Sequence, residues 1–119
     1  MIWFYDSIAS IRDFLELGGD VLYAIMARDA PNSIAIRPQV RPRHLAYLQP
    51  LVDEGRVVFA GPHPAIDSPD PGPAGFSGSL IIAEFDSLES AKAWSASDPY
   101  TVEGVFAEVE IKPVLQARP

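Results

Sequence analysis

The stretch Val21-Leu22-Tyr23-Ala24-Ile25-Met26-Ala27 decides the fold, because it is a continuous apolar run of strand length between Asp20 and the pair Arg28-Asp29. A strand without polar interruption is typical of the centre of a sheet, where both faces are buried. We therefore predict that this segment is a central strand and that the rest of the chain packs around it.

The segment that follows predicts a helix that begins near Pro42 and ends at Gly55. Its apolar stripe consists of Leu45, Leu48, Leu51 and Val52. Proline suits the first turn of a helix but disfavours the interior. We therefore expect a break at Pro38, before the helix, and a bend at Pro50, within it.

Three more strands and one more helix complete the pattern. Segments 56–60 and 79–85 are short apolar runs, and 105–112 alternates apolar and polar residues, as a strand with one solvated face does. Ser87 is a good N-cap for a helix that stops at Asp98-Pro99, because proline disfavours helical backbone in the residue before it. The order strand, helix, strand, strand, helix, strand predicts an α+β fold with the ferredoxin-like split βαβ arrangement.

This arrangement predicts that copies of the chain associate. Right-handed crossovers place both helices on one face of the sheet, so the apolar residues of the other face need a different cover. A second copy of the sheet is the simplest cover. We therefore expect a dimeric α+β barrel, as a homodimer or a higher even oligomer.

Residues 1–19 predict an amphipathic helix that precedes a domain spanning residues 20–119. Its stripe consists of Phe4, Ile8, Ile11 and Leu15, and Gly18-Gly19 can end it. A helix this short has to dock on other structure to be stable. It can pack on its own domain or grip another subunit, and the sequence leaves both open.

The composition indicates one acidic domain and excludes several classes of protein. The chain has 119 residues, a formal net charge of −7 and no cysteine. Its few basic residues form no stripe for nucleic acid or an anionic membrane, and thiolate metal sites and cysteine nucleophiles are excluded. No apolar run approaches the roughly 20 residues that span a bilayer, and no signal-peptide pattern occurs. We therefore expect a cytoplasmic protein.

Residues 61–78 are dominated by proline and glycine, which disfavours any regular element there. A loop of this length inside a compact domain is usually functional or disordered. Prolines lower the entropy that is lost when a loop becomes ordered. We therefore expect an ordered lid or wall beside a pocket.

Five short motifs occur along the chain: Leu22-Tyr23-Ala24-Ile25-Met26-Ala27-Arg28-Asp29, Arg41-Pro42-Arg43-His44-Leu45-Ala46-Tyr47-Leu48, Ala60-Gly61-Pro62, Gly75-Phe76-Ser77-Gly78-Ser79 and Asp98-Pro99-Tyr100. In order and spacing they resemble the YciI-like (YCII) proteins over about residues 21–114. The resemblance implies a ferredoxin-like dimeric barrel with a His/Asp active site. Most members have no assigned reaction, and a few act in aromatic degradation, including elimination of halide from a chlorinated hydroxyhydroquinone. Residues 1–19 depart from the family pattern, whose members usually begin at the first strand.

His44 and Asp98 are the candidate catalytic residues, because they stand where the resemblance places the His and Asp of the family. A neutral imidazole can take or give a proton, and a carboxylate can orient it and stabilise its charged form. The plainer alternatives are a polar helix residue at His44 and a turn or cap residue at Asp98. The two helices of this fold run roughly parallel, so the start of one and the end of the other lie apart. The pair can meet only if the first helix begins well before His44, or if two subunits share the site.

The candidate substrate-binding residues are Ser79, Arg41, Tyr100 and His63. Ser79 lies at the exit of the loop, and no nucleophile elbow surrounds it, which disfavours a role as a hydrolase nucleophile. Either its hydroxyl binds substrate, or the residue is simply the first of a strand. Arg41 and Tyr100 lie in the motifs that carry His44 and Asp98, and His63, between two prolines, can wall a pocket or be structural. The two histidines lack metal-ligand spacing, and no glycine-rich dinucleotide or phosphate motif occurs. We therefore expect neither a metal nor a cofactor.

These residues predict a cofactor-independent acid–base enzyme of lyase or isomerase type that acts on a small, oxygenated cyclic metabolite. The resemblance implies aromatic or halo-aromatic degradation as its setting. Two alternatives stay open: a non-catalytic homo-oligomer that binds a small molecule or is structural, and a cofactor-free oxygenase on the same barrel. An enzyme needs His44 to line a closed, polar-rimmed cavity, whereas a binding protein needs only an apolar cavity.

Overall fold

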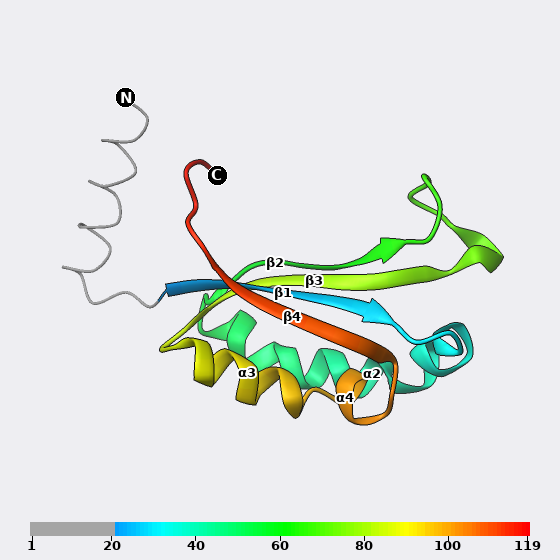
Figure 1. Cartoon of the computed structure of the whole chain (residues 1–119), viewed down its shortest axis with the longest axis horizontal. Coiled ribbons are helices and arrows are strands. Elements are labelled where there is room, and N and C mark those ends of the chain that lie inside the picture. Colours follow the sequence, from blue (N-terminus) through cyan, green and yellow to red (C-terminus); the bar gives the residue numbers. More distant parts are fainter. Residues whose placement is uncertain (1–20) are drawn as a thin grey trace.

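A computed structural model describes residues 21–119 of the chain (Figure 1). Its elements are β1 (Val21–Asp29), α2 (Ser33–Asp53), β2 (Val57–Pro64), a 3-10 turn η1 (Gly72–Ala74), β3 (Phe76–Phe85), α3 (Leu88–Ala96), α4 (Pro99–Val102) and β4 (Phe106–Val114). The amphipathic helix expected in residues 1–19 lies outside the described residues. No helix among residues 21–119 is both long and apolar enough to cross a membrane.

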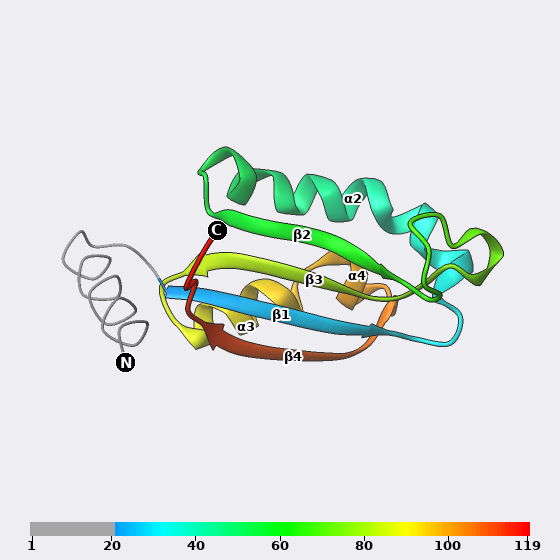
Figure 2. The same ribbon diagram turned by 90° about the horizontal axis from the view of Figure 1, so that it is seen from above.

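The four strands form one sheet in the order β2-β3-β1-β4, in which every neighbouring pair is antiparallel. Seen from above, β1 and β3 lie in the middle and β2 and β4 form the edges (Figure 2). The chain is therefore an α+β protein with the ferredoxin-like arrangement, and the prediction of fold class is confirmed. β1 is a central strand, as its apolar sequence predicts.

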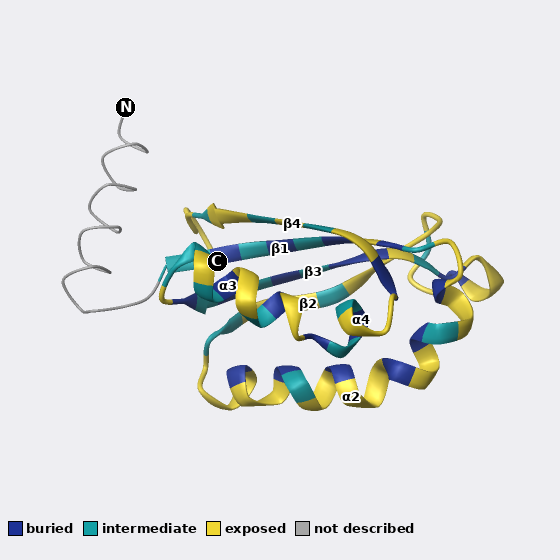
Figure 3. Cartoon of the chain, turned by 60° about the horizontal axis from the view of Figure 1, so that its bottom comes forward, coloured by how far each residue is buried: buried dark blue, intermediate teal, exposed yellow. Residues whose placement is uncertain are grey.

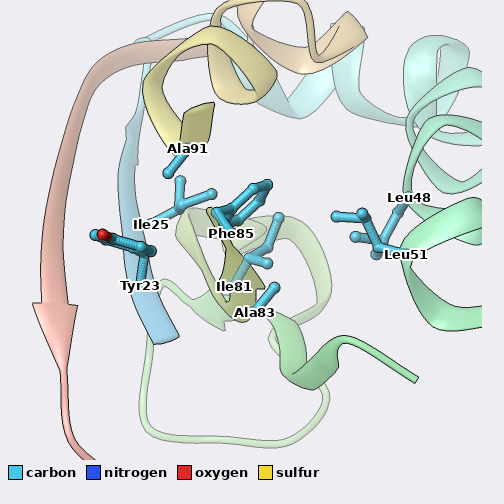
Figure 4. Close-up of a cluster of buried hydrophobic side chains, with 8 residues drawn as sticks. All are labelled: Tyr23, Ile25, Leu48, Leu51, Ile81, Ala83, Phe85 and Ala91. Atoms are coloured by element: carbon cyan, nitrogen blue, oxygen red, sulfur yellow. The ribbon is translucent and has the colours of Figure 1, made fainter. Parts of the chain in front are cut away.

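The three helices of residues 21–119, α2, α3 and α4, lie on one face of the sheet (Figure 1). The larger of two clusters of buried hydrophobic side chains lies between them and that face, and its members are Tyr23, Ile25, Leu48, Leu51, Ile81, Ala83, Phe85 and Ala91. Leu48 and Leu51 of α2 and Ala91 of α3 belong to the same cluster as the strand residues (Figure 4). Within the described residues β1 is covered on one face only, since its alternate residues Leu22, Ala24 and Met26 are half-buried.

Helix α2 begins at Ser33, earlier than the sequence suggests. The prediction of a break at Pro38 is therefore wrong. The helix runs without interruption from Ser33 to Asp53 through Pro38, Pro42 and Pro50. All three prolines are on its exposed side, while buried residues recur along the side that faces the sheet (Figure 3). On the exposed side, water can bind the carbonyl oxygens that proline leaves without an amide partner.

The segment expected to be wholly irregular, 61–78, is partly strand. β2 continues to Pro64, and β3 begins at Phe76, with Pro64 paired opposite Phe76. β2 is an edge strand, and an edge strand tolerates proline because one side of its backbone needs no partner. Only residues 65–75 connect the two strands, and η1 lies among them.

Candidate functional site

Helix α2 carries His44 in its interior. Because the helix begins at Ser33, about three turns precede His44. His44 is 8% exposed and lies on the buried side of the helix with Val40 and Leu48. The early start of α2 supplies one of the two conditions under which His44 can meet Asp98.

Asp98 is the N-cap of the one-turn helix α4. Its backbone is extended, its Oδ1 accepts a hydrogen bond of 2.9 Å from the Tyr100 backbone N–H, and Pro99 occupies the first helical position. The side chain is almost wholly buried, with the residue 1% exposed. Asp98 is therefore a helix cap, and this role leaves its carboxylate free to accept from a second donor.

That second donor is the imidazole of His44. His44 Nδ1 and Asp98 Oδ1 lie 2.8 Å apart in a buried contact within one chain. A carboxylate only accepts hydrogen bonds, so the contact holds the proton on Nδ1 and leaves the lone pair of neutral His44 on Nε2. No described residue bonds to Nε2, which makes this nitrogen the atom that can exchange a proton with a bound molecule.

Tyr100 packs flat against His44. The two ring centroids are 4.0 Å apart and the ring planes differ by 10°. Tyr100 also meets Phe106 edge-on at 5.4 Å, and it is buried. Burial raises the pKa of Tyr100, and the charges of Arg37 and Arg41 oppose that rise. The phenol is therefore protonated at neutral pH, where its hydroxyl can donate a hydrogen bond.

A buried ion pair adjoins this stack, and neither of its members was among the sequence candidates. Arg37 Nε lies 2.6 Å from Asp29 Oδ2, and Arg37 Nη2 lies 3.0 Å from Asp29 Oδ1. Nη2 also donates to the Gly78 carbonyl and to Ser79 Oγ, each at 2.9 Å. A signal for Arg37 existed in the sequence, because it precedes His44 by two helical turns. The break expected at Pro38 concealed it.

The structure brings five of the six candidates to one region and separates the sixth, His63. Ser79 is buried, and its hydroxyl oxygen accepts the hydrogen bond from Arg37 Nη2. Arg41 lies on exposed helix surface near enough for its charge to act on Tyr100. His63 instead lines a separate open hollow of about 580 Å³ with residues 64–69. Neither His44 nor Asp98 contributes to that hollow.

The described residues contain no group of three or more side chains suited to hold a metal ion. The site consists of the buried pair of His44 and Asp98, with the phenol of Tyr100 stacked on the imidazole. Such a set can bind an oxygenated molecule and move a proton.

The family model of the YCII-related domain matches residues 21–115. Protein YciI of Escherichia coli is 57% identical over 93 residues, which cover 78% of this chain and 95% of that protein. An uncharacterized protein of Haemophilus influenzae is 50% identical over 91 residues, which cover 76% of this chain and 93% of that protein. Among solved structures, 5-chloro-2-hydroxyhydroquinone dehydrochlorinase of Burkholderia phenoliruptrix, in complex with 2,5-dihydroxybenzoquinone, has a TM-score of 0.68 and 28% identity, covering 76% of this chain and 90% of that one.

Proposed function

The chain belongs to the YCII-related family, and from that premise we propose that it is a cofactor-independent acid–base enzyme of lyase or isomerase type. In this proposal His44 carries the proton, Asp98 orients it, and the substrate is a small oxygenated ring compound. Support for a small-molecule substrate comes from the structural neighbour, which is a dehydrochlorinase in complex with a quinone.

The observation that carries the proposal is the buried contact between His44 and Asp98. His44 Nε2 takes a proton from a hydroxyl or C–H group of the substrate, and the buried carboxylate stabilises the imidazolium that forms. In a lyase, the electron pair left on the substrate moves into the ring, and a leaving group departs with its own bonding pair. In an isomerase, Nε2 returns the proton to another atom.

Two side chains next to His44 are proposed to hold the substrate. The Tyr100 hydroxyl donates to a substrate oxygen, since burial keeps the phenol protonated. Arg41 supplies positive charge for an ionised oxygen. Its neighbour Arg43 reaches Glu103 at 3.6 Å, whereas no described carboxylate pairs with Arg41. Ser79 acts indirectly, through Arg37.

A second copy of the chain is proposed to cover the open face of the sheet. The side chains that alternate with the core residues of β1 and β3 point away from the helices, and most are apolar: Leu22, Ala24, Met26, Leu80 and Ile82. Phe59 on β2 is paired opposite Ile82 and is 50% exposed. Burial of such a surface against its own copy gives a dimer with two sheets face to face.

The test measures turnover of a probe compound by the parent and by variants at each of the two histidines of the chain. The probe is 5-chloro-2-hydroxyhydroquinone, and the product measured is free chloride, alongside a panel of other small oxygenated rings. We expect His44→Asn to lower turnover of any compound that the parent converts by about a hundred- to ten-thousand-fold, and His63→Asn to leave it unchanged. A parent that binds 2,5-dihydroxybenzoquinone but converts nothing would favour a binding protein. Full activity in His44→Asn would refute the assignment of the proton carrier.

A further inference from the structure

Arg37 joins two strands of the sheet beside the stacked rings of His44 and Tyr100. Its fork binds Asp29 at the end of β1, and its Nη2 binds the carbonyl of Gly78 and the hydroxyl of Ser79 on β3. The guanidinium is thereby fixed in position and orientation by two strands. A charged group that is 8% exposed and held through both Nε and Nη2 has little freedom to move.

The fixed guanidinium lies over aromatic rings. Its Cζ is 5.0 Å from the Tyr100 ring centroid and 5.4 Å from that of Phe76. Both distances are within the range of cation–π attraction, which is strongest where water is excluded. Arg37 therefore contacts the same ring against which His44 is stacked.

Tyr100 needs such support, because its own element is short. α4 contains four residues, Pro99–Val102, and a single turn of helix is not stable alone. The backbone of Tyr100 is held at its N–H by Asp98 and at its carbonyl by the Val105 N–H. These bonds fix the backbone and leave the direction of the ring to its neighbours, His44, Phe106 and Arg37.

We propose that Arg37 is a positioning residue of this site, which through Asp29 and β3 holds the Tyr100 ring flat against the His44 imidazole. This inference rests on the proposed function in so far as the orientation of His44 matters for catalysis. The contacts run in one series from Asp29 through Arg37 and Tyr100 to His44 and Asp98. Loss of the guanidinium lets Tyr100 turn, so that the His44 imidazole keeps its contact with Asp98 but loses the flat support of the Tyr100 ring.

The test uses the ring-current effect of Tyr100 on His44. In the folded parent, we expect the ring C–H protons of His44 to resonate upfield of those of His63, because His44 lies over an aromatic face. Assignment is direct, since the chain has two histidines. We expect Arg37→Met to lose most of that displacement at constant pH. The Asp29→Asn/Arg37→Met double variant removes both buried charges and keeps the test possible if the single variant unfolds.

Arg56→Met is the matched control. Arg56 also donates to a backbone carbonyl, that of Glu84, and also lies over a ring, with Cζ 5.4 Å from the Phe85 centroid. It has no contact with His44 or Tyr100, so we expect the His44 resonances to stay in place. A folded double variant with the parental His44 shifts would overturn the proposal and make Arg37 a stabiliser of the fold alone.

The two proposals fail in different ways. If no ring compound is converted by the parent while the stack depends on Arg37, the positioning role stands and the enzyme proposal fails. If conversion depends on His44 while the His44 ring-proton shifts do not change when Arg37 is replaced, the enzyme proposal stands and the positioning role fails. If Arg37→Lys keeps the His44 shifts and still weakens binding of 2,5-dihydroxybenzoquinone, Arg37 contacts the ligand directly and the positioning role is overturned.

Discussion

His44 and Tyr100 stack face to face, with ring centroids 4.0 Å apart and planes that differ by 10°. The stack joins residues that are far apart in sequence, one in the middle of α2 and one on α4. It also joins two buried carboxylates, because Asp98 holds His44 and Asp29 holds Arg37, which lies over Tyr100. The candidate site is therefore a small network in which each group limits the movement of the next.

We expect Asp98→Asn to lower turnover of a converted probe as much as His44→Asn does. Loss of general acid–base catalysis typically costs about a hundred- to ten-thousand-fold in rate. The His44→Asn/Asp98→Asn double variant should be little worse than either single variant, because residues that act as a unit are not additive. Steady-state kinetics on the three variants measures this. Losses that multiply in the double variant would show that the two side chains act independently.

In the parent, the positive charge of Arg41 favours the phenolate and lowers the pKa of Tyr100. We therefore expect Arg41→Gln, which removes this charge, to raise the pKa of Tyr100 further. Arg43→Gln is the control, since Arg43 pairs with Glu103. Absorbance near 295 nm during an alkaline titration reports phenolate formation. The same titration of a Tyr100→Phe variant isolates this residue from Tyr47, whose pKa burial also raises. Equal effects of the two arginine variants would contradict the placement of Arg41 beside the site.

The raised pKa of Tyr100 also predicts a pH dependence of stability. The folded state favours the protonated phenol, so this contribution is fully present below the unfolded-state pKa of about 10. It is lost as the pH rises through the higher folded-state pKa. Chemical unfolding should therefore become easier above about pH 10 in the parent, and less so in Tyr100→Phe. A parallel decline in both proteins would count against this explanation.

We expect Gly78→Ala to destabilise the protein and to disturb the Arg37 cluster. A Cβ at this position would clash with the Ala27 carbonyl oxygen, so β1 and β3 would have to separate there. Forced overpacking of this kind typically costs about 1–3 kcal/mol. Gly61→Ala is the control, because its Cβ would meet only the movable ring of Phe59 at 3.2 Å. Thermal unfolding measures both, and equal melting temperatures would contradict the prediction.

We expect sedimentation at micromolar concentration to show a dimer or a larger even assembly. Ile82→Glu should shift it toward monomer, because a charge on the open face of the sheet cannot be buried without cost. Val102→Glu, at an exposed position of α4, should leave the assembly unchanged. A well-folded monomeric parent would refute the proposed dimer.

We expect removal of residues 1–19 to lower either thermal stability or oligomer size. The basis is the predicted apolar stripe of that segment, which would be buried against its own domain or another subunit. Calorimetry and sedimentation of the truncated chain distinguish these two effects. A truncated protein of equal stability and equal size would show that the segment does not dock.

The sequence by itself determined the fold class and named both members of the His–Asp pair. The apolar run of β1 and the order of the elements are local properties, because periodicity along the chain reflects which residues a strand or helix buries. The position of His44 and Asp98 in the motifs of the YCII-related family supplied the pair. Nothing in the local pattern showed whether the two side chains meet.

Only the tertiary structure decided that the side chains of His44 and Asp98 meet, and which groups support them. Pro38 made the start of α2 look interrupted, yet all three prolines of the helix lie on its exposed side, where water can bind the carbonyl oxygens left without an amide partner. The longer helix carries Arg37 to Asp29 and Ser79. These contacts join residues from three elements, and no spacing along the chain encodes them. They follow from the packing of α2 on the sheet, where a buried charge is stable only beside its partner.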